Sequence, residues 1–343
     1  MRIKQADLER DREELIQVLL QYLTEGSSPR RYDWLYLHNP AGPAKAWLAE
    51  EEGEVVGAAA AFPRRISVHG EESIGCVLGD FCMAPRLRSV GPAIKLQRAC
   101  LEAVEPQWAV LAYDFPSSSL MAVYRRLGFQ AYASFVRLAK PLRTNRAFEQ
   151  RIPVRPVAHA LSVLGNLALR LRDLPAEHDS ESEVALHVGP CTEEFTALAR
   201  RESAAFGVCV FRSAEYLNWR FLSNPFSQFE IWTHRRKGQL TGYLIVGLHE
   251  DNATIADLFG ERDLRMVRNL IAHIAPALRR RGVITLSAHM VPSHPFFPVL
   301  QSLGFQPRES TPVVVFEGGP NGGIWSEKTR EQSWSLMAGD RDS

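Results

Sequence analysis

A turn near residue 90 carries the residue types that bind phosphate groups. The segment MAPRLRSVGPAIKLQRACLEAV begins at the end of a hydrophobic run, continues with basic residues, and changes to an amphipathic helix pattern near Pro92. The first N–H groups of a helix lack partners within the helix, and the helix dipole favours negative charge there. Gly91 lets an anion approach the backbone, and Arg86 and Arg88 add positive charge. The turn is therefore either a pyrophosphate site or a basic, solvated turn.

A second set of candidate residues follows the strand-like run WAVLAYDF. A short helix pattern there carries Tyr124, and Gly128-Phe129 turns the chain into a last strand. Tyr124 is either a proton donor or a tyrosine that packs on the sheet. Asp80 and Asp114 lie near the ends of two predicted central strands. Either could act as a general base, directly or through a water molecule, and each is also a candidate turn or capping residue.

Together the two segments resemble the signatures of the GNAT superfamily of acyl-CoA-dependent N-acyltransferases. The pyrophosphate loop of that family has the form Arg/Gln-x-x-Gly-x-Gly/Ala, matched by Arg88-Ser-Val-Gly91-Pro-Ala93. Its second signature is a helical Tyr separated by three residues from a Gly-Phe pair, matched by YRRLGF beginning at Tyr124. Two departures stand out. Ser117 occupies a position that is Asn in many members, and the proline at 92 removes one amide.

The resemblance implies roles for two sets of residues. The pyrophosphate of acetyl-CoA or another acyl-CoA would bind backbone amides of the turn, at Arg88, Ser89, Val90, Gly91 and Ala93. The pantetheine arm would pair with the preceding strand edge, at Phe81, Cys82 and Met83. Tyr124 would protonate the leaving thiolate, a contribution of ~10²–10⁴ in rate, or hydrogen-bond the sulfur. Asp80 is the first candidate for the base, and no metal is expected.

The chain also contains a long internal repeat. YDWLYLHNP in the first half matches YLNWRFLSNP in the second, and Trp219 lies 185 positions after Trp34. GEVVGAAAAF matches GQLTGYLIVG at the same offset, and YRRLGFQ matches LQSLGFQ further along. Matches in the same order and at nearly one spacing indicate a duplicated domain. Because Trp and Tyr at helical spacing usually bury area, the Trp-aromatic-x-x-Asn-Pro segments are interpreted as structural and not as acceptor-binding.

Each half predicts strands first, then alternating helices and strands. This order is typical of an α/β (α+β) fold, and with the resemblance it predicts two tandem GNAT-like domains, each a mixed, mostly antiparallel sheet flanked by helices. The expected boundaries are residues 1–140 for the first domain, 141–184 for a linker with an amphipathic helix, 185–317 for the second domain and 318–343 for a flexible tail. The linker helix is expected to dock between the domains, and contact with an anionic membrane surface is the alternative.

The second half lacks the residues that carry the chemistry. Its equivalent turn reads FGERDLRM, where Glu261 and Asp263 would repel a pyrophosphate, and Leu300 stands where the first half has its tyrosine. This half is therefore expected to keep the fold, without catalysis, and to bury a face of the first domain or shape the acceptor site. His289 and His294 fit no standard zinc spacing and are interpreted as ordinary loop residues.

Composition limits the possible partners and compartments. Hydrophobic residues make up 45% and charged residues 23% of the 343 residues, as in globular proteins with ample core. The net charge of +1 gives no field that would recruit nucleic acid. Five cysteines without a CxxC pair, no signal-peptide pattern and no membrane-length apolar run favour a cytoplasmic protein without stable membrane insertion.

Three functions remain open. The first is transfer of an acetyl or related acyl group from acyl-CoA to an amine of a small molecule or peptide, by the first half. The second is a non-catalytic acyl-CoA-binding or scaffold protein. The third is similar to the tandem-GNAT aminoacyltransferases that use charged tRNA, but the near-neutral charge disfavours it because RNA binding normally requires a basic stripe. The first is preferred, and an oligomer remains possible.

Overall fold

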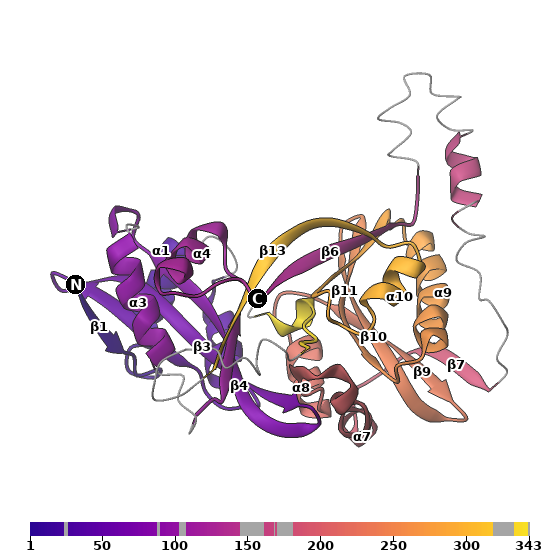
Figure 1. Cartoon of the computed structure of the whole chain (residues 1–343), viewed down its shortest axis with the longest axis horizontal. Coiled ribbons are helices and arrows are strands. Elements are labelled where there is room, and N and C mark those ends of the chain that lie inside the picture. Colours follow the sequence, from indigo (N-terminus) through magenta and orange to yellow (C-terminus); the bar gives the residue numbers. More distant parts are fainter. Residues whose placement is uncertain are drawn as a thin grey trace.

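A computed structural model describes residues 1–23, 27–87, 90–102, 108–144, 161–167, 169, 181–317 and 333–341 of the chain. The two halves lie side by side, and strands β6 (Ala133–Pro141) and β13 (Gln306–Glu317) cross the space between them (Figure 1). The mixed, mostly antiparallel sheet flanked by helices that the sequence predicts is confirmed.

The elements of the two halves follow in the same order, except that η2 occurs only in the first half and η3 and β8 only in the second. Those of the N-terminal half that precede β6 are β1 (Arg2–Gln5), α1 (Arg12–Tyr22), α2 (Pro29–Tyr32), the π-helical turn η1 (Asp33–Leu37), β2 (Lys45–Glu51), β3 (Glu54–Val68), β4 (Glu71–Met83), η2 (Pro85–Leu87), α3 (Val90–Glu102), β5 (Leu111–Asp114) and α4 (Ser118–Arg126). Those of the C-terminal half that precede β13 are β7 (Ser182–Leu186), α7 (Glu193–Glu202), η3 (Ser203–Phe206), β8 (Val208–Val210), α8 (Ala214–Leu217), the π-helical turn η4 (Asn218–Leu222), β9 (Phe229–Arg236), β10 (Gln239–His249), β11 (Asn252–Gly260), α9 (Leu264–Arg280), β12 (Thr285–Met290) and α10 (Phe297–Ser302). A last turn, η5 (Ala338–Asp340), follows β13.

The two halves exchange their last strands. The described strands form one sheet in the order β1-β2-β3-β4-β5-β13-β6-β12-β11-β10-β9-β7, and β8 pairs separately with β3. Strand β13 of the C-terminal half pairs with β5, while β6 of the N-terminal half pairs with β12. The two exchanged strands pair with each other in the middle. The sheet therefore runs through both halves without a break.

The repeated tryptophans meet across the contact between the halves. Trp34 donates its indole N–H to the carbonyl oxygen of Trp219 at 3.0 Å, and Trp219 donates to the carbonyl oxygen of Trp34 at the same distance. The two rings stack with centroids 5.0 Å apart. Both tryptophans lie in equivalent π-helical turns and are buried. This reciprocal pair supports the structural interpretation of the repeated segment.

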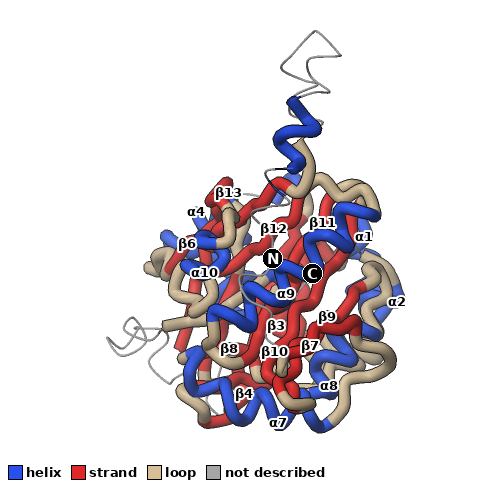
Figure 2. The backbone as a smooth tube through the Cα atoms, turned by 90° about the vertical axis from the view of Figure 1, so that its right-hand side faces the viewer, coloured by secondary structure: helices blue, strands red, loops and turns tan. Residues whose placement is uncertain are grey.

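Strand β3 lies between two hydrophobic cores. Successive side chains of a strand point to opposite faces of the sheet. Accordingly Ala58, Ala60 and Phe62 belong to the core shared with the C-terminal half, whereas Ala59 and Ala61 belong to the core under α3 and α4. In Figure 2 the helices lie outside the strands. The small side chains of β3 let helices approach the sheet closely from both sides.

Strands β4 and β5 separate soon after they meet. Their parallel pairing covers only two residue pairs, Cys76 with Ala112 and Val77 with Tyr113. Beyond Val77, β4 continues to Met83 while β5 ends at Asp114. The edge of β4 that faces away from β3 is therefore left without a neighbouring described strand over its last residues.

The chain end is packed into the molecule, contrary to part of the predicted flexible tail. Residues 333–341 are mostly buried, and Met337 forms an antiparallel bridge with Met290 of β12. The carbonyl oxygen of Gly339 accepts hydrogen bonds from Tyr216 and Arg220. The glycine-rich stretch before this segment suggested a flexible tail, but SWSLM supplies apolar side chains that the core accommodates. Residues 318–332 and 342–343 lie outside the described residues.

The described part of the linker contacts the C-terminal half. Residues 161–167 are helical, and Arg279 of α9 donates to the carbonyl oxygen of Leu169 at 3.4 Å. Val163, Leu164 and Leu167 are each more than half exposed. Figures 1 and 2 show this helix projecting from the body of the protein, so its described turn does not dock between the halves as the sequence suggested.

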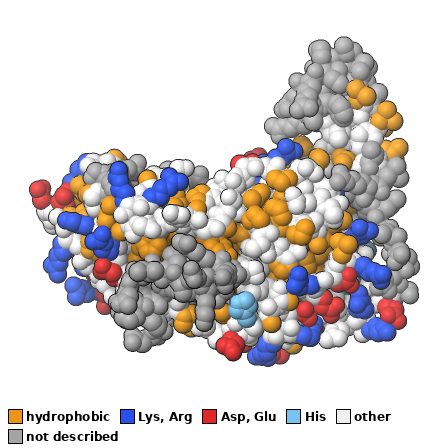
Figure 3. Space-filling model, in the orientation of Figure 1, with side chains coloured by type: hydrophobic (Ala, Val, Ile, Leu, Met, Phe, Trp, Pro, Cys, Tyr) orange, Lys and Arg blue, Asp and Glu red, His pale blue; other side chains and the backbone are white. Residues whose placement is uncertain are grey.

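Surface charges are mixed on the face seen in Figure 3. Hydrophobic side chains gather over its middle, and Lys and Arg side chains lie beside Asp and Glu side chains toward both ends. Among the described helices, none is both long and apolar enough to cross a membrane.

Candidate functional site

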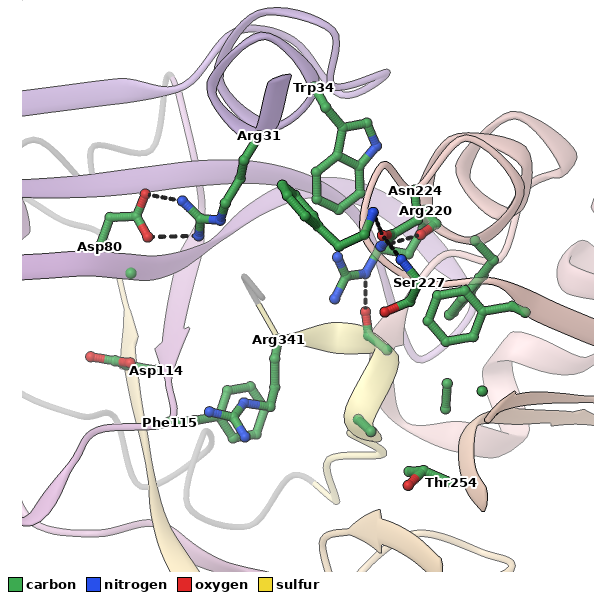
Figure 4. A pocket seen from close by; sticks show the side chains of 18 of the residues that line it. Arg31, Trp34, Asp80, Asp114, Phe115, Arg220, Asn224, Ser227, Thr254 and Arg341 are labelled. Atoms are coloured by element: carbon green, nitrogen blue, oxygen red, sulfur yellow. Dashed lines mark hydrogen bonds and ion pairs between the residues drawn. The ribbon is translucent and has the colours of Figure 1, made fainter. Parts of the chain in front are cut away.

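A cleft lies between the two halves, where β4 and β5 separate. It has a volume of about 870 Å³. The residues that the N-terminal half contributes include 79–81 of β4 and 114–117 at the end of β5 and just after it. The C-terminal half contributes residues from η4 to β11, and the chain end contributes Ala338, Gly339 and Arg341. Figure 4 shows charged side chains reaching this space from both halves.

The strand–turn–helix arrangement around residue 90 forms as predicted. Strand β4 ends at Met83, η2 follows, and α3 begins at Val90 with no acidic residue in its first turn. Gly91 is exposed, and a Cβ atom there would meet nothing within 4 Å. Ala93 is buried against the sheet. The N-terminus of α3 is thus open to an anion, while Arg88, Ser89 and the side chain of Val90 lie outside the described residues.

Asp80 is held in a buried ion pair. It lies at a bulge of β4, where two residues oppose Ala59 of β3, and its φ of 50° is in the left-handed region that Asp tolerates. Both carboxylate oxygens accept from Arg31, at 2.6 and 2.7 Å, and one also accepts from the hydroxyl of Tyr36 at 2.7 Å. Figure 4 shows this pair at one wall of the cleft. Because these contacts occupy both oxygens of Asp80, they disfavour its predicted role as the general base. That role stays a prediction.

The predicted pantetheine edge divides between the cleft and the core. Phe81 lines the cleft and is partly exposed. The side chains of Cys82 and Met83 are buried in the two different cores. Because the free edge of β4 presents backbone groups beyond Val77, the pairing expected for a pantetheine arm depends on the backbone and not on these two side chains.

Tyr124 and Asp114 form a buried pair beside the cleft. The hydroxyl of Tyr124 donates to Asp114 Oδ2 at 2.5 Å and accepts from Gln97 Nε2 at 2.9 Å. Asp114 lines the cleft, whereas the tyrosine is fully buried and packs against Phe316 of the exchanged strand. Burial, and then the charge of Asp114, raises the pKa of Tyr124 well above its usual value. The tyrosine therefore stays protonated and able to donate.

The equivalent gap of the C-terminal half is filled. Strands β11 and β12 pair in parallel only from Asn252 to Ile255, and the chain end lies against both strands beyond that point. A Cβ atom on Gly339 would lie 3.0 Å from the carbonyl oxygen of Ala256. Asp263 caps α9 by accepting from the backbone N–H of Arg265 at 2.8 Å. In the second half, the chain end therefore fills the gap between the strands, and Asp263 occupies the N-terminus of the helix that corresponds to α3.

The two histidines named in the sequence analysis are packed within the protein. His294 is buried, and its Nδ1 accepts from the backbone N–H of Phe296 at 3.1 Å. Burial lowers the pKa of His294 to about 3. Burial, followed by the charge of Arg137, also lowers the pKa of His289. Among the residues that the structure describes, no group of His, Cys, Asp and Glu side chains is arranged to hold a metal ion.

Three features of the site lie outside the sequence prediction. Arg31 neutralises Asp80, Gln97 donates to Tyr124, and the chain end forms one wall of the cleft. Arg31 stands on α2, remote from the motifs in sequence, whereas Gln97 lies on α3 within the first motif segment, where nothing in the local pattern marks its contact with Tyr124. In the sequence, the apolar residues around Trp334 indicate that the chain end packs against the protein core.

Comparisons with known proteins agree with this geometry. Residues 4–132 match the model of the acetyltransferase (GNAT) domain. Comparison with curated protein sequences gives no significant match. Among solved structures, a probable N-acyltransferase of unknown function from Enterococcus faecalis V583 has a TM-score of 0.66 at 12% identity, covering 92% of this chain and 72% of that one.

Two further structures have the same fold. A GCN5-related N-acetyltransferase from Anabaena variabilis has a TM-score of 0.65 at 16% identity, over 92% of this chain and 73% of that one. A tandem GNAT protein from the clavulanic acid biosynthesis pathway has a TM-score of 0.56 at 12% identity, over 93% of this chain and 99% of that one. Residues 4–132 thus match the acetyltransferase domain of the GNAT family, and the chain as a whole resembles GNAT proteins in fold, including a tandem GNAT protein.

Proposed function

We propose that this protein transfers an acetyl or related acyl group from acyl-CoA to an amine of a small molecule or peptide. The observation that carries the proposal is the separation of β4 from β5 next to the Tyr124–Asp114 pair. The free strand edge at Phe81 and the carboxylate of Asp114 line the cleft, and the buried hydroxyl of Tyr124 lies behind Asp114. The free edge would bind the pantetheine arm, and the turn from Arg88 to Ala93 would bind the pyrophosphate.

In the proposed reaction the amine nitrogen attacks the thioester carbonyl carbon. The carbon–sulfur bond breaks, an amide forms, and the thiolate of CoA leaves. The amine proton passes to Asp114, and Tyr124 protonates the thiolate. Tyr124 recovers a proton from Asp114 through their 2.5 Å hydrogen bond. Protons and electrons balance without a further reactant.

Asp114 is favoured over Asp80 as the base in this proposal. Both oxygens of Asp80 accept from Arg31, and the side chain is 1% exposed. A base needs a lone pair within reach of the proton that it removes. Asp114 lines the cleft at the end of β5, on the side of the gap opposite Asp80. Asp80 then positions Arg31 and the bulge of β4.

Acetyl-CoA binding tests the proposed cofactor site. Saturation at about a hundred times Kd adds roughly 2.7 kcal/mol to the free energy of unfolding for a single site. We expect thermal unfolding of the wild type to shift upward with acetyl-CoA, and the shift to vanish in Gly91→Glu. The new side chain has open space at this exposed glycine, so the loss would report charge and not misfolding. Ala197→Glu, on an exposed position of α7, is the matched control. No shift in the folded wild type would contradict the proposal.

Tyr124→Phe separates catalysis from mere binding. The alternative function, a non-catalytic acyl-CoA-binding or scaffold protein, is favoured by one observation: the tyrosine hydroxyl already has two buried partners. For an acyltransferase, release of CoA thiol should fall ~10²–10⁴-fold while acetyl-CoA still binds. Unchanged function in the variant would support the alternative. Five buried cysteines that form no disulfide favour a cytoplasmic location for either function.

A further inference from the structure

The charged side chains of the cleft do not cancel. Its described lining includes three arginines, Arg31, Arg220 and Arg341, and two aspartates, Asp80 and Asp114. Arg31 and Asp80 neutralise each other in their buried pair. The rest of the described lining therefore contains two guanidinium groups, of Arg220 and Arg341, and one carboxylate, of Asp114.

Arg341 is the cation with the fewest partners. Its guanidinium carbon lies 5.7 Å from the centroid of the Phe115 ring. Its Nε is buried without a hydrogen-bond partner, and no carboxylate of the described residues forms an ion pair with it. In Figure 4 the side chain extends from the chain end toward Phe115. Because arginine stays charged and an unsatisfied buried donor is unfavourable, this geometry favours a bound anion.

The backbone that carries Arg341 is fixed by both halves. Tyr113 of β5 donates to the carbonyl oxygen of Asp340 at 2.9 Å, and Arg212 forms an ion pair with the Asp340 side chain at 2.8 Å. Arg220 donates its Nε–H to the carbonyl oxygen of Gly339 at 2.8 Å. A cation on a rigid support can select a ligand because little ordering is needed on binding.

The rest of the cleft suits an apolar group. Phe115 supplies an aromatic surface from the N-terminal half, and Phe221, Phe226 and Phe229 supply others from the C-terminal half. Aromatic side chains bury large areas of a ligand with few rotatable bonds. The cleft thus offers an apolar wall, a fixed cation and, at Asp114, a carboxylate.

We infer that the acceptor is an amine that carries both an apolar body and a carboxylate, as apolar amino acids do. Arg341 binds the acceptor carboxylate, the phenylalanines contact its body, and the amine faces Asp114. This inference rests on the proposed function and names the acceptor class of the same site. Arg341 is then a specificity-determining residue and takes no part in proton transfer.

The test compares two acylated products that differ only in the carboxylate. N-acetyl-L-phenylalanine carries it, and N-phenethylacetamide lacks it. Each is titrated by calorimetry into the wild type and into Arg341→Gln. A hydrogen-bonded ion pair predicts about tenfold to a hundredfold tighter binding of the carboxylate compound to the wild type. Arg341→Gln should lose that preference and bind N-phenethylacetamide unchanged. Arg200→Gln, at an exposed arginine on α7, should behave as wild type.

Three results would overturn the inference: equal or weaker binding of the carboxylate compound, no binding of either compound, or a preference that survives in Arg341→Gln. Acetyl-CoA is titrated into the same samples. If acetyl-CoA binds but the carboxylate gives no preference, only the acceptor inference fails. If the preference holds but acetyl-CoA does not bind, the proposed acyl transfer fails and the anion site stands.

Discussion

Removing Arg31 should destabilise the protein strongly although it leaves the hydrophobic core intact. The side chains of Arg31 and Asp80 are 6% and 1% exposed and share two hydrogen bonds. In Arg31→Met the carboxylate stays buried and, among the described residues, keeps the hydroxyl of Tyr36 as its side-chain donor. Breaking a buried ion pair in this way costs about 3–5 kcal/mol, because one charge is left uncompensated. Urea unfolding followed by tryptophan fluorescence should show a lower midpoint at unchanged slope.

A double-mutant cycle makes this prediction specific. Asp80→Asn alone leaves Arg31 without its carboxylate and should also destabilise. Arg31→Met combined with Asp80→Asn removes both charges, and Asn still accepts from Tyr36 and tolerates the positive φ at the bulge. The double variant should therefore recover most of the lost stability. As a control, Arg12→Met breaks the exposed pair with Asp33 and should have a much smaller effect because solvent screens that pair.

The same variants separate a positioning role of Asp80 from a role as general base. If Asp80 were the base, Asp80→Asn would keep wild-type stability and lose turnover by ~10²–10⁴. If Asp80 holds Arg31, the variant loses stability, and the molecules that remain folded keep most of their turnover. Wild-type stability of Arg31→Met would refute the reasoning from burial.

Further changes test the chain end, a buried histidine and the thiols. Gly339→Val should destabilise by about 1–3 kcal/mol and expose the chain end to proteolysis, because a Cβ atom there lies 2.7 Å from Phe221 Cζ. His294 has a pKa lowered to about 3, so the unfolded chain takes up its proton first as pH falls below 6.5. Wild-type stability should therefore decrease by up to about 1.4 kcal/mol per pH unit below 6.5, and His294→Gln should lack this contribution. All five cysteines are buried, so a thiol reagent should react slowly with the native protein and rapidly in urea.

The duplication and the class of fold could be predicted because they depend on local patterns. Trp34 and Trp219 recur with the same neighbours, and each half repeats the same order of strand-like and helix-like runs. The turn between β4 and α3 is predictable for the same reason, because the glycine and proline there act within a few residues. Strand–turn–helix geometry at 83–91 follows from these local preferences.

Other features depend on choices between distant partners. Strands β6 and β13 are both suitable neighbours for β5, and the residues of the two strands do not indicate which of them pairs with β5. Arg31 is likewise one of many arginines, and only the folded chain brings it to Asp80. The chain end differs from the flexible tail that its glycine-rich approach predicts, because Trp334, Leu336 and Met337 are buried in the folded protein.

The strand exchange has a consequence for how the protein is made. When β5 and β6 have been synthesised, the strand that pairs with β5 on the side away from β4 has not, since β13 begins at residue 306. Until then, the edge of β5 in the nascent first half is unpaired, and an unpaired strand edge can pair with the wrong strand. Contacts between such distant segments also slow folding. A gene fragment that ends in the linker would encode β1 to β6 without β13, the strand that completes the sheet beside β5, and we expect it not to fold into a stable domain.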